Sequence, residues 1–150
     1  MTTATQVAEY LIGLAHTRGV SINNAKLQRL LYYVQAWHLA LRNRPLFGDR
    51  FQAWIYGPAI PHVYWAYDPH GWQEIPCPES IPVLPDVETA FIHEVAEGYL
   101  PLDEWELEDL ARSEAPWLNA RGGIPIEDPS TAEISEDDMC AYYRRIEAAA

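Results

Sequence analysis

A wide apolar stripe at helical spacing runs between Asn23 and Asn43 and is the strongest pattern in the sequence. Its large apolar side chains recur every three or four residues, which is the period of one face of an α-helix. Ser21 and Asn23 are candidate N-caps, because their side-chain oxygens can accept a hydrogen bond from the first helical turn. The pattern ends at Asn43–Pro45, since proline cannot continue a helix. The stripe consists of Leu27, Leu30, Leu31, Val34, Trp37, His38 and Leu41.

The other faces of this helix carry aromatic and polar side chains, which leaves two interpretations open. A central helix surrounded by others would bury the aromatic ones, whereas a protein interface would use them as contacts, because Trp, Tyr and Arg dominate binding hot spots. The residues that this choice concerns are Tyr32, Tyr33, Gln35 and Trp37. We expect the long polar side chains to point outward or toward a partner. These are Lys26, Gln28, Arg29, Gln35 and Arg42.

Helical spacing elsewhere predicts further helices. One covers residues 3–16, ends near Gly19 and forms a helical hairpin with the helix above. Another covers residues 86–99, from Asp86 to a break at Pro101, and a third surrounds Leu107 and Leu110. A short turn holds residues 116–118, and a loop over residues 122–131 leads to the last helix. That helix begins at Ser135 and is expected to turn Met139, Tyr142, Tyr143 and Ile146 inward.

Residues 51–56 are aromatic and β-branched and predict a short strand or extended arm that Gly57 and Pro58 close. Pro58 is expected to begin a helix through residues 63–66 that stops near Pro69. Four prolines in residues 76–85 exclude a helix or a central strand there, so this stretch is an extended connection. The sequence therefore predicts one mainly α domain over residues 1–150, with five to six helices and a small extended or β element near residues 51–56.

The charge of the chain is strongly asymmetric. The net charge is −12, but residues 1–70 carry six basic against three acidic side chains and residues 71–150 carry four against nineteen. Phosphate backbones repel such a chain as a whole, which argues against nucleic acid as a partner. A DNA-binding autorepressor built on the mildly basic first half stays as a minor alternative. We expect the two halves to attract each other, and Lys26, the only lysine, to anchor to the acidic half by a hydrogen bond or ion pair.

An acidic segment from Asp103 to Asp109 surrounds Trp105 with five carboxylates. One interpretation is a solvated helix face, with negative charge placed favourably in the first turn. The other is an aromatic anchor inside an acidic ring, which suits a basic protein partner and electrostatically steered encounter. The candidate partner-binding residues of this segment are Glu104, Trp105, Glu108 and Asp109.

A second candidate surface comes from five large aromatic residues within fourteen positions. One strand and one short helix do not usually bury so many rings, and an exposed apolar patch marks a binding surface. Burial in the core and contact with a partner are evenly balanced for these residues. They are Trp54, Tyr56, Tyr64, Trp65 and Tyr67.

Enzymatic motifs are almost absent. His93 and Glu97 lie one turn apart on a helix, with Glu94 beside them, and this resembles half of a zincin motif in which the second histidine is missing. A small metal-dependent hydrolase that uses these three residues is the enzyme alternative, and a solvated helix face is the simpler interpretation. We expect no enzyme activity, no metal and no cofactor.

The location of the protein follows from what the chain lacks. Cys77 and Cys140 are far apart and match no metal-binding spacing, which is typical of a reducing compartment. No apolar run is long enough to span a bilayer, and the N-terminus has no signal-peptide pattern. We therefore expect a cytoplasmic protein with no membrane partner.

Five stretches, taken together in their order, resemble a known family. The first is the helical string of residues 26–39, and the others are residues 45–47, residues 53–64 with Tyr56-Gly57-Pro58, residues 114–121 with Glu114-Ala115-Pro116-Trp117, and residues 134–143. In these stretches the chain is similar to the Panacea domain, the SocA-like antitoxin family that is related to phage-associated GepA proteins. The resemblance covers roughly residues 5 to 146. Two differences are Ala111-Arg112-Ser113, where the family often has Thr-His, and Ile55, where a basic residue is common.

The resemblance implies a non-enzymatic antitoxin, bacterial or from a prophage, that neutralises a cognate toxin by direct protein contact. An alternative within the family is a proteolytic adaptor that delivers its toxin to a ClpXP-type protease. The acidic second half suggests that the toxin has a basic surface. The family motif residues, interpreted as structural, are Lys26, Leu27, Leu30, Leu31, Tyr32, Tyr33, Gln35, Trp37, His38, Gly57, Pro58, Pro116 and Trp117.

Overall fold

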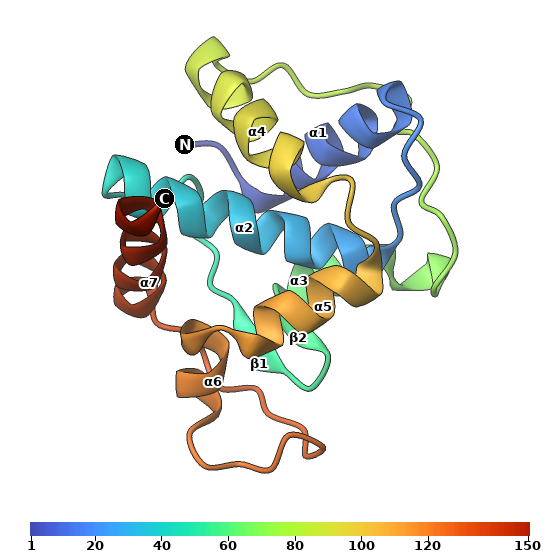
Figure 1. The fold of residues 1–150 in the computed structure, drawn as a ribbon. Helices are drawn as coiled ribbons and strands as arrows, with labels where there is room; N and C mark the ends of the chain where they lie inside the picture. The colour runs from blue at the N-terminus through green and yellow to red at the C-terminus, as the bar shows by residue number, and fades with distance from the viewer.

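A computed structural model describes residues 1–150 and contains seven α-helices, one 3-10 turn and one small antiparallel sheet (Figure 1). The mainly α fold with a small β element is thereby confirmed. The helix count exceeds the expected five to six, partly because the turn expected at residues 116–118 is a short helix. The elements are α1 (Ala4–Thr17), α2 (Asn24–Arg42), β1 (Gln52–Trp54), β2 (Gly57–Ala59), α3 (Pro61–Tyr67), η1 (Asp68–His70), α4 (Asp86–Tyr99), α5 (Glu104–Ser113), α6 (Ala115–Arg121) and α7 (Glu136–Ala149).

Helix α2 is the central element of the fold, and other elements cover it on all sides. Figure 1 shows α1 and α4 along one side, α5 and the small sheet along the other, and α7 beside its C-terminal half. Tyr32, Tyr33 and Gln35 are accordingly buried, and Trp37 is partly buried. The surrounded-helix interpretation is therefore correct.

The prediction that the polar side chains of α2 point outward is wrong for all but Arg42. Lys26, Gln28, Arg29 and Gln35 are each at most 5% exposed. Because α2 has neighbours on every face, these side chains meet backbone groups of irregular segments that would otherwise lack partners. Gln28 Oε1 accepts a hydrogen bond from the Ile60 amide at 2.9 Å. Lys26 Nζ donates to the Leu100 carbonyl at 2.6 Å, which confirms the expected anchor to the second half of the chain.

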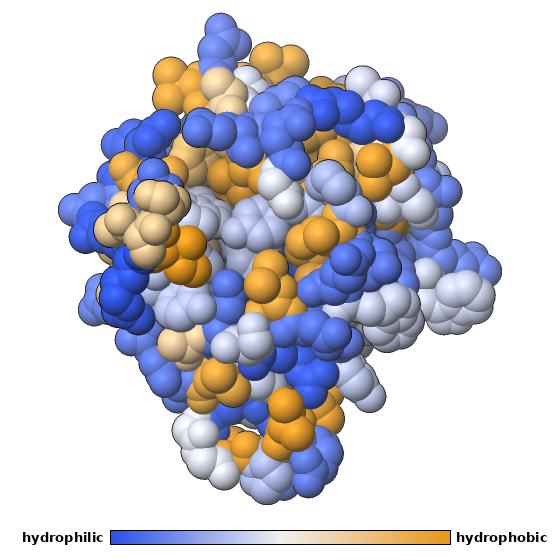
Figure 2. Space-filling model, viewed as in Figure 1, coloured by the Kyte–Doolittle hydropathy of each residue, from blue (hydrophilic) through white to orange (hydrophobic).

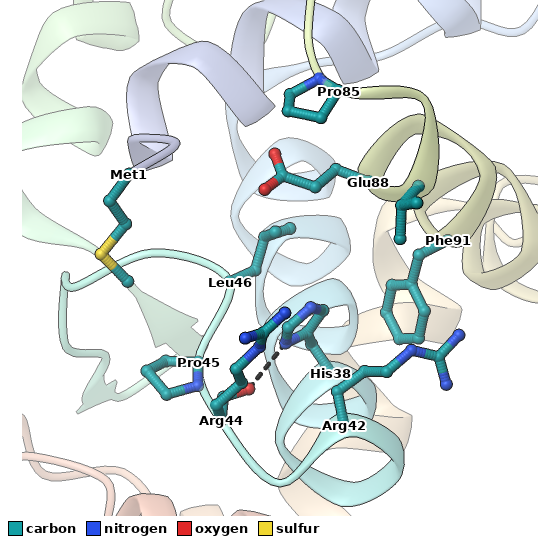
Figure 3. A pocket seen from close by; sticks show the side chains of 10 residues that line it. Met1, His38, Arg42, Arg44, Pro45, Leu46, Pro85, Glu88 and Phe91 are labelled. Carbon is teal, nitrogen blue, oxygen red and sulfur yellow. Dashed lines mark hydrogen bonds between the residues drawn. The ribbon is translucent and has the colours of Figure 1, made fainter.

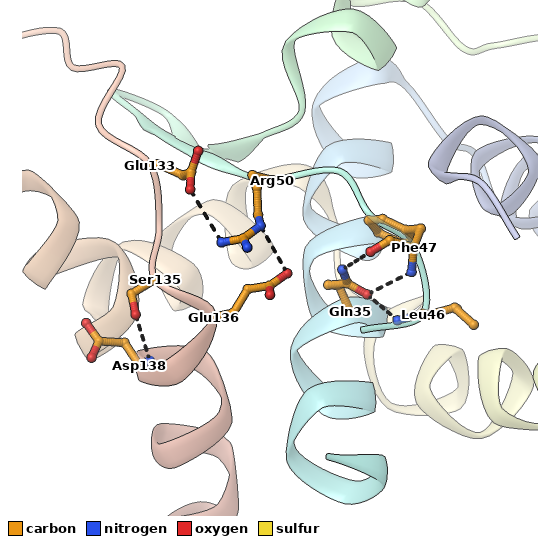
Figure 4. A network of polar contacts seen from close by, with 8 residues as sticks. All are labelled: Gln35, Leu46, Phe47, Arg50, Glu133, Ser135, Glu136 and Asp138. Carbon is orange, nitrogen blue, oxygen red and sulfur yellow. Dashed lines mark hydrogen bonds and ion pairs between the residues drawn. The ribbon is translucent and has the colours of Figure 1, made fainter. Parts of the chain in front are cut away.

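Gln35 and Arg50 hold the segment between α2 and β1 (Figure 4). The Gln35 amide accepts from the Leu46 N–H at 2.8 Å and donates to the Phe47 carbonyl at 2.7 Å. Arg50 lies between the carboxylates of Glu133 and Glu136, at 3.4 and 3.5 Å. The expected attraction between the two halves therefore exists, but Arg50 and Glu133 are exposed, and such pairs contribute at most about 1 kcal/mol.

The expected helix boundaries hold at most ends, because they depend on local caps. Asn23, not Ser21, caps α2 by accepting from the Lys26 amide at 2.9 Å. Asn43 ends that helix in the left-handed conformation, with φ of 58°. Helix α4 begins at Asp86, and Ser135 caps α7 (Figure 4).

The sheet is a hairpin in which Ile55 and Tyr56 form a two-residue turn between β1 and β2. Pro58 lies in β2 opposite Ala53 and does not begin a helix, so that prediction is wrong. Pro61 opens α3 instead, since the N–H that proline lacks is not needed in a first helical turn. The Ile60 N–H, one residue earlier, is bound by Gln28.

A buried carboxylate joins α2, α6 and α7. Glu114, the residue before α6, is 6% exposed and accepts hydrogen bonds from the hydroxyls of Tyr33 at 2.6 Å and Tyr143 at 2.8 Å. Burial raises the pKa of Glu114, and the two tyrosine hydrogen bonds oppose that rise. Tyr143 also donates to the Tyr32 hydroxyl at 3.1 Å, so one polar cluster crosslinks three helices inside the core.

Candidate protein-binding groove

The hairpin turn, α3 and the first half of α5 enclose a groove of about 390 Å³ above the N-terminal half of α2. We call it the aromatic–acidic groove. Its walls carry aromatic rings on the hairpin and α3 side, and one ring with two carboxylates on the α5 side. The groove is lined by Ala25, Arg29, Trp54, Ile55, Tyr56, Tyr64, Glu104, Trp105 and Glu108.

Arg29 forms the floor of the groove and holds the hairpin turn in place. Its Nη1 donates to the Ala25 carbonyl at 3.1 Å, and its Nη2 donates to the Tyr56 carbonyl. Burial lowers the pKa of Arg29 to about 10, an effect that the nearby Glu108 carboxylate opposes. The guanidinium donates to these two backbone carbonyls and forms no ion pair with either groove carboxylate.

Trp54 is oriented by contacts on both sides of the hairpin. Its carbonyl accepts from Trp117 Nε1 at 2.9 Å, and its own Nε1 donates to Gln52 Oε1 at 2.7 Å. The Trp54 ring meets Tyr64 edge-on, with centroids 5.0 Å apart, and Trp65 at 6.2 Å. Three rings of the hairpin and α3 therefore form one cluster, and the Trp65 side is open to solvent.

The acidic segment contains carboxylates that cap α5 and carboxylates that line the groove. Asp103 caps α5 by accepting from the Glu106 amide at 2.8 Å, and the Glu106 carboxylate accepts from the Asp103 amide in return. Glu104 and Glu108 lie one turn apart on the groove side of α5, and neither takes part in an ion pair or a side-chain hydrogen bond. The capping explanation thus accounts for Asp103 and Glu106 and leaves these two carboxylates free.

Most of the candidate partner-binding residues meet here, although they come from two separate sequence segments. Trp65 contacts the groove through Trp54 and Tyr64 without lining it. Tyr67 and Asp109 do not join the groove: Tyr67 is half-buried against the core and stacks on His70, and Asp109 is exposed elsewhere on α5. Sequence reasoning expected Arg29 to point outward or toward a partner and did not place it with the candidate contact residues, whereas the structure buries it in the floor of their groove.

The other motif residues have packing roles. Trp117 is 1% exposed, with the Arg121 guanidinium 4.7 Å from its ring centre. His38 donates from Nδ1 to the Arg44 carbonyl at 2.6 Å beside a hollow of about 460 Å³ (Figure 3). Burial lowers the pKa of His38, which favours the neutral ring, and the hydrogen bond to Arg44 fixes the segment after α2.

The three residues of the hydrolase alternative do not converge. His93 is hydrogen-bonded to the Tyr10 hydroxyl at 2.6 Å, and Glu97 pairs with Arg18 at 2.7 Å. Glu94 lines a separate groove between α2, α4, α5 and α7. No group of three His, Cys, Asp or Glu side chains is placed to bind a metal. None of the helices is both long and apolar enough to cross a bilayer.

Comparison with known proteins identifies the family. Residues 27–118 match the family model described as antitoxin SocA-like, Panacea domain. The chain belongs to this family. The matched residues include every residue of the aromatic–acidic groove except Ala25, whereas α1 and α7 lie outside them.

A curated relative is Antitoxin SocA of Caulobacter vibrioides (strain NA1000 / CB15N). It is 37% identical over 68 residues, which is 45% of this chain and 36% of the relative. The match thus spans about a third of the relative's length. No solved structure matches the chain.

Proposed function

We propose that this protein is an antitoxin that neutralises a cognate toxin by binding it directly through the aromatic–acidic groove. Membership of the SocA-like antitoxin family supports the antitoxin role. The observation that carries the choice of surface is the convergence of exposed aromatic rings and two free carboxylates in one groove. No enzyme activity is needed for this function.

The aromatic residues are the expected anchors of the interface. Tyr56 and Trp105 are each 65% exposed and Trp65 is 61% exposed. Each of these side chains therefore has a large apolar area that a partner would bury. Trp and Tyr anchors of this kind carry most of the binding energy in protein interfaces. Hydrogen bonds from Arg29 to the Tyr56 carbonyl and from Trp117 to the Trp54 carbonyl fix the hairpin wall of the groove, so little ordering of that wall opposes binding.

The carboxylates give the chemistry of the partner. Glu104 and Glu108 contribute two negative charges to the groove, and the one positive charge there, on Arg29, is buried beneath the surface. The surface that fits is therefore basic and carries Lys or Arg side chains. Long-range attraction to the acidic half of the chain accelerates encounter with such a partner.

The test uses the product of the neighbouring reading frame as the toxin. We expect co-expression with the wild-type protein to restore growth, and Trp105→Ala and Tyr64→Ala to abolish or weaken this rescue. Trp72→Ala is the matched control, because Trp72 is 82% exposed and lies outside the groove. If both groove variants neutralise the toxin as well as wild type does, the toxin does not bind at this surface.

A purified pair distinguishes direct neutralisation from delivery to a protease. Direct binding predicts that the protein inhibits its toxin in a two-component assay that contains no protease. The adaptor alternative predicts no inhibition there, and faster toxin degradation once a ClpXP-type protease is added.

A further inference from the structure

A second groove, of about 430 Å³, lies between α2, α4, α5 and α7 and shares no residue with the aromatic–acidic groove. We call it the α4–α5 groove. Its apolar walls include Trp37, Val95, Tyr99, Leu102 and Leu110. Figure 2 shows the face of the molecule that carries these helices, where apolar side chains interrupt the polar surface.

Gly98, in the last turn of α4, lines this groove, and neither its backbone conformation nor a close neighbour within the chain requires a glycine there. It has no positive φ, unlike Gly19, Gly57, Gly71 and Gly122. Outside its own helix, no heavy atom lies within 4 Å of the position that a Cβ would take. Glycine is a poor helix former, so a residue with a side chain would suit α4 better here. The missing side chain leaves room for close approach by something outside the chain.

The edges of the α4–α5 groove are acidic. Glu94 on α4 and Glu147 on α7 line it, and neither takes part in an ion pair. No Lys or Arg side chain lines the groove. An apolar channel between helices, with carboxylates at its edges, matches an amphipathic helix whose apolar face is flanked by basic residues.

A second copy of this chain fits the groove poorly. A symmetric dimer uses the same patch on both copies, so Glu94 and Glu147 of both chains would enter one interface to which the groove brings no Lys or Arg. The net charge of −12 on each chain adds to that repulsion. The charges therefore favour a different protein.

We propose that the α4–α5 groove is a second docking site, which binds a basic amphipathic helix of a partner protein, with Gly98 as the point of closest approach. This site is independent of the groove assigned to the toxin, so the protein is able to contact two segments at once.

The test measures binding of a fluorescently labelled helical peptide of leucine and lysine by anisotropy. Gly98→Leu places a side chain in the groove and is expected to weaken binding at least about tenfold, the loss typical of one blocked anchor. Trp105→Ala, in the other groove, is expected to leave binding unchanged. Hydrogen exchange of the wild-type complex is expected to show new protection in α4 and α5.

Gly98→Ala provides a second measurement that separates folding from binding. It is expected to raise the melting temperature of the protein, because alanine favours the helix more than glycine does. It is nevertheless expected to weaken binding of the peptide. The proposal would be overturned if wild type and Gly98→Leu bound the leucine–lysine peptide equally. It would also be overturned if the wild-type protein bound a leucine–glutamate peptide as tightly as the leucine–lysine peptide. A dimer of the wild-type chain that Gly98→Leu dissociates would assign the groove to a second copy instead.

Discussion

The guanidinium of Arg29 lies directly against Gly57, so that a Cβ on this glycine would stand 2.6 Å from Arg29 Nε. Gly57 also has a φ of 124°, which side-chain-bearing residues rarely adopt. Both requirements come from one arrangement: Arg29 reaches past Gly57 to the Tyr56 carbonyl and fixes the turn that forms one wall of the aromatic–acidic groove.

We therefore predict that Gly57→Ala destabilises the protein by about 1–3 kcal/mol, the usual cost of a strained backbone position. Urea unfolding measures this change. Gly123→Ala is the control, because Gly123 has neither a positive φ nor any atom near its Cβ position. Equal stability of the two variants would contradict the role given to the Arg29 contact.

The double variant Glu104→Gln/Glu108→Gln is predicted to slow association with the proposed toxin partner roughly threefold to tenfold at low salt, because it removes the free carboxylates of the groove. Its association rate is also expected to depend less on salt than that of wild type. Stopped-flow kinetics at several salt concentrations measures both. Glu127→Gln/Asp137→Asn removes the same charge from exposed positions outside the groove, and an equal effect of this control would show that only net charge matters.

Glu114→Gln is predicted to gain stability relative to wild type as the pH rises from the ordinary glutamate pKa of 4.5 through the raised pKa of the folded chain. The raised pKa of Glu114 means that its contribution to stability is fully present below the pKa of the unfolded chain and is lost as the pH rises through the folded pKa. Glutamine does not titrate, and its Oε1 is still able to accept from Tyr33 and Tyr143, which both donate to Oε1 of Glu114.

Urea unfolding of wild type and Glu114→Gln at several pH values tests this prediction. Glu114→Ala is the companion variant, which is expected to be about 1–3 kcal/mol less stable than Glu114→Gln at every pH, because neither side chain titrates and the buried tyrosine hydroxyls lose their acceptor. A difference between wild type and Glu114→Gln that stays constant with pH would contradict the assignment.

Asn23→Ala is predicted to cost about 1 kcal/mol of stability, because it removes the side-chain oxygen that caps α2. Ser21→Ala is the matched control: Ser21 is exposed, makes no side-chain hydrogen bond and is expected to leave the melting temperature unchanged. Thermal unfolding compares the two. A larger loss of stability in Ser21→Ala than in Asn23→Ala would contradict this assignment and place the helix cap at Ser21.

Local signals in the sequence predicted the helices well. The start of α4 at Asp86 and the ends of α2 were all expected, because a cap or a proline acts on its neighbours in the chain. The Pro58 prediction failed because a local signal alone did not choose between two structures. Proline is compatible with both a helix start and a strand, and the choice depended on pairing with Ala53 and on Gln28 binding the Ile60 amide.

By itself, the sequence determined the class of the fold, the placement of most helices, the acidic second half and the two groups of candidate contact residues. Only the tertiary structure decided that Trp54, Tyr56 and Tyr64 share one groove with Glu104, Trp105 and Glu108, that Arg29 forms its floor, and that Tyr67 and Asp109 lie elsewhere. Helical periodicity and capping depend on residues a few positions apart. The groove depends on which elements pack around α2. A polar side chain of α2 is buried where it can bind a backbone group of another segment that would otherwise lack a partner.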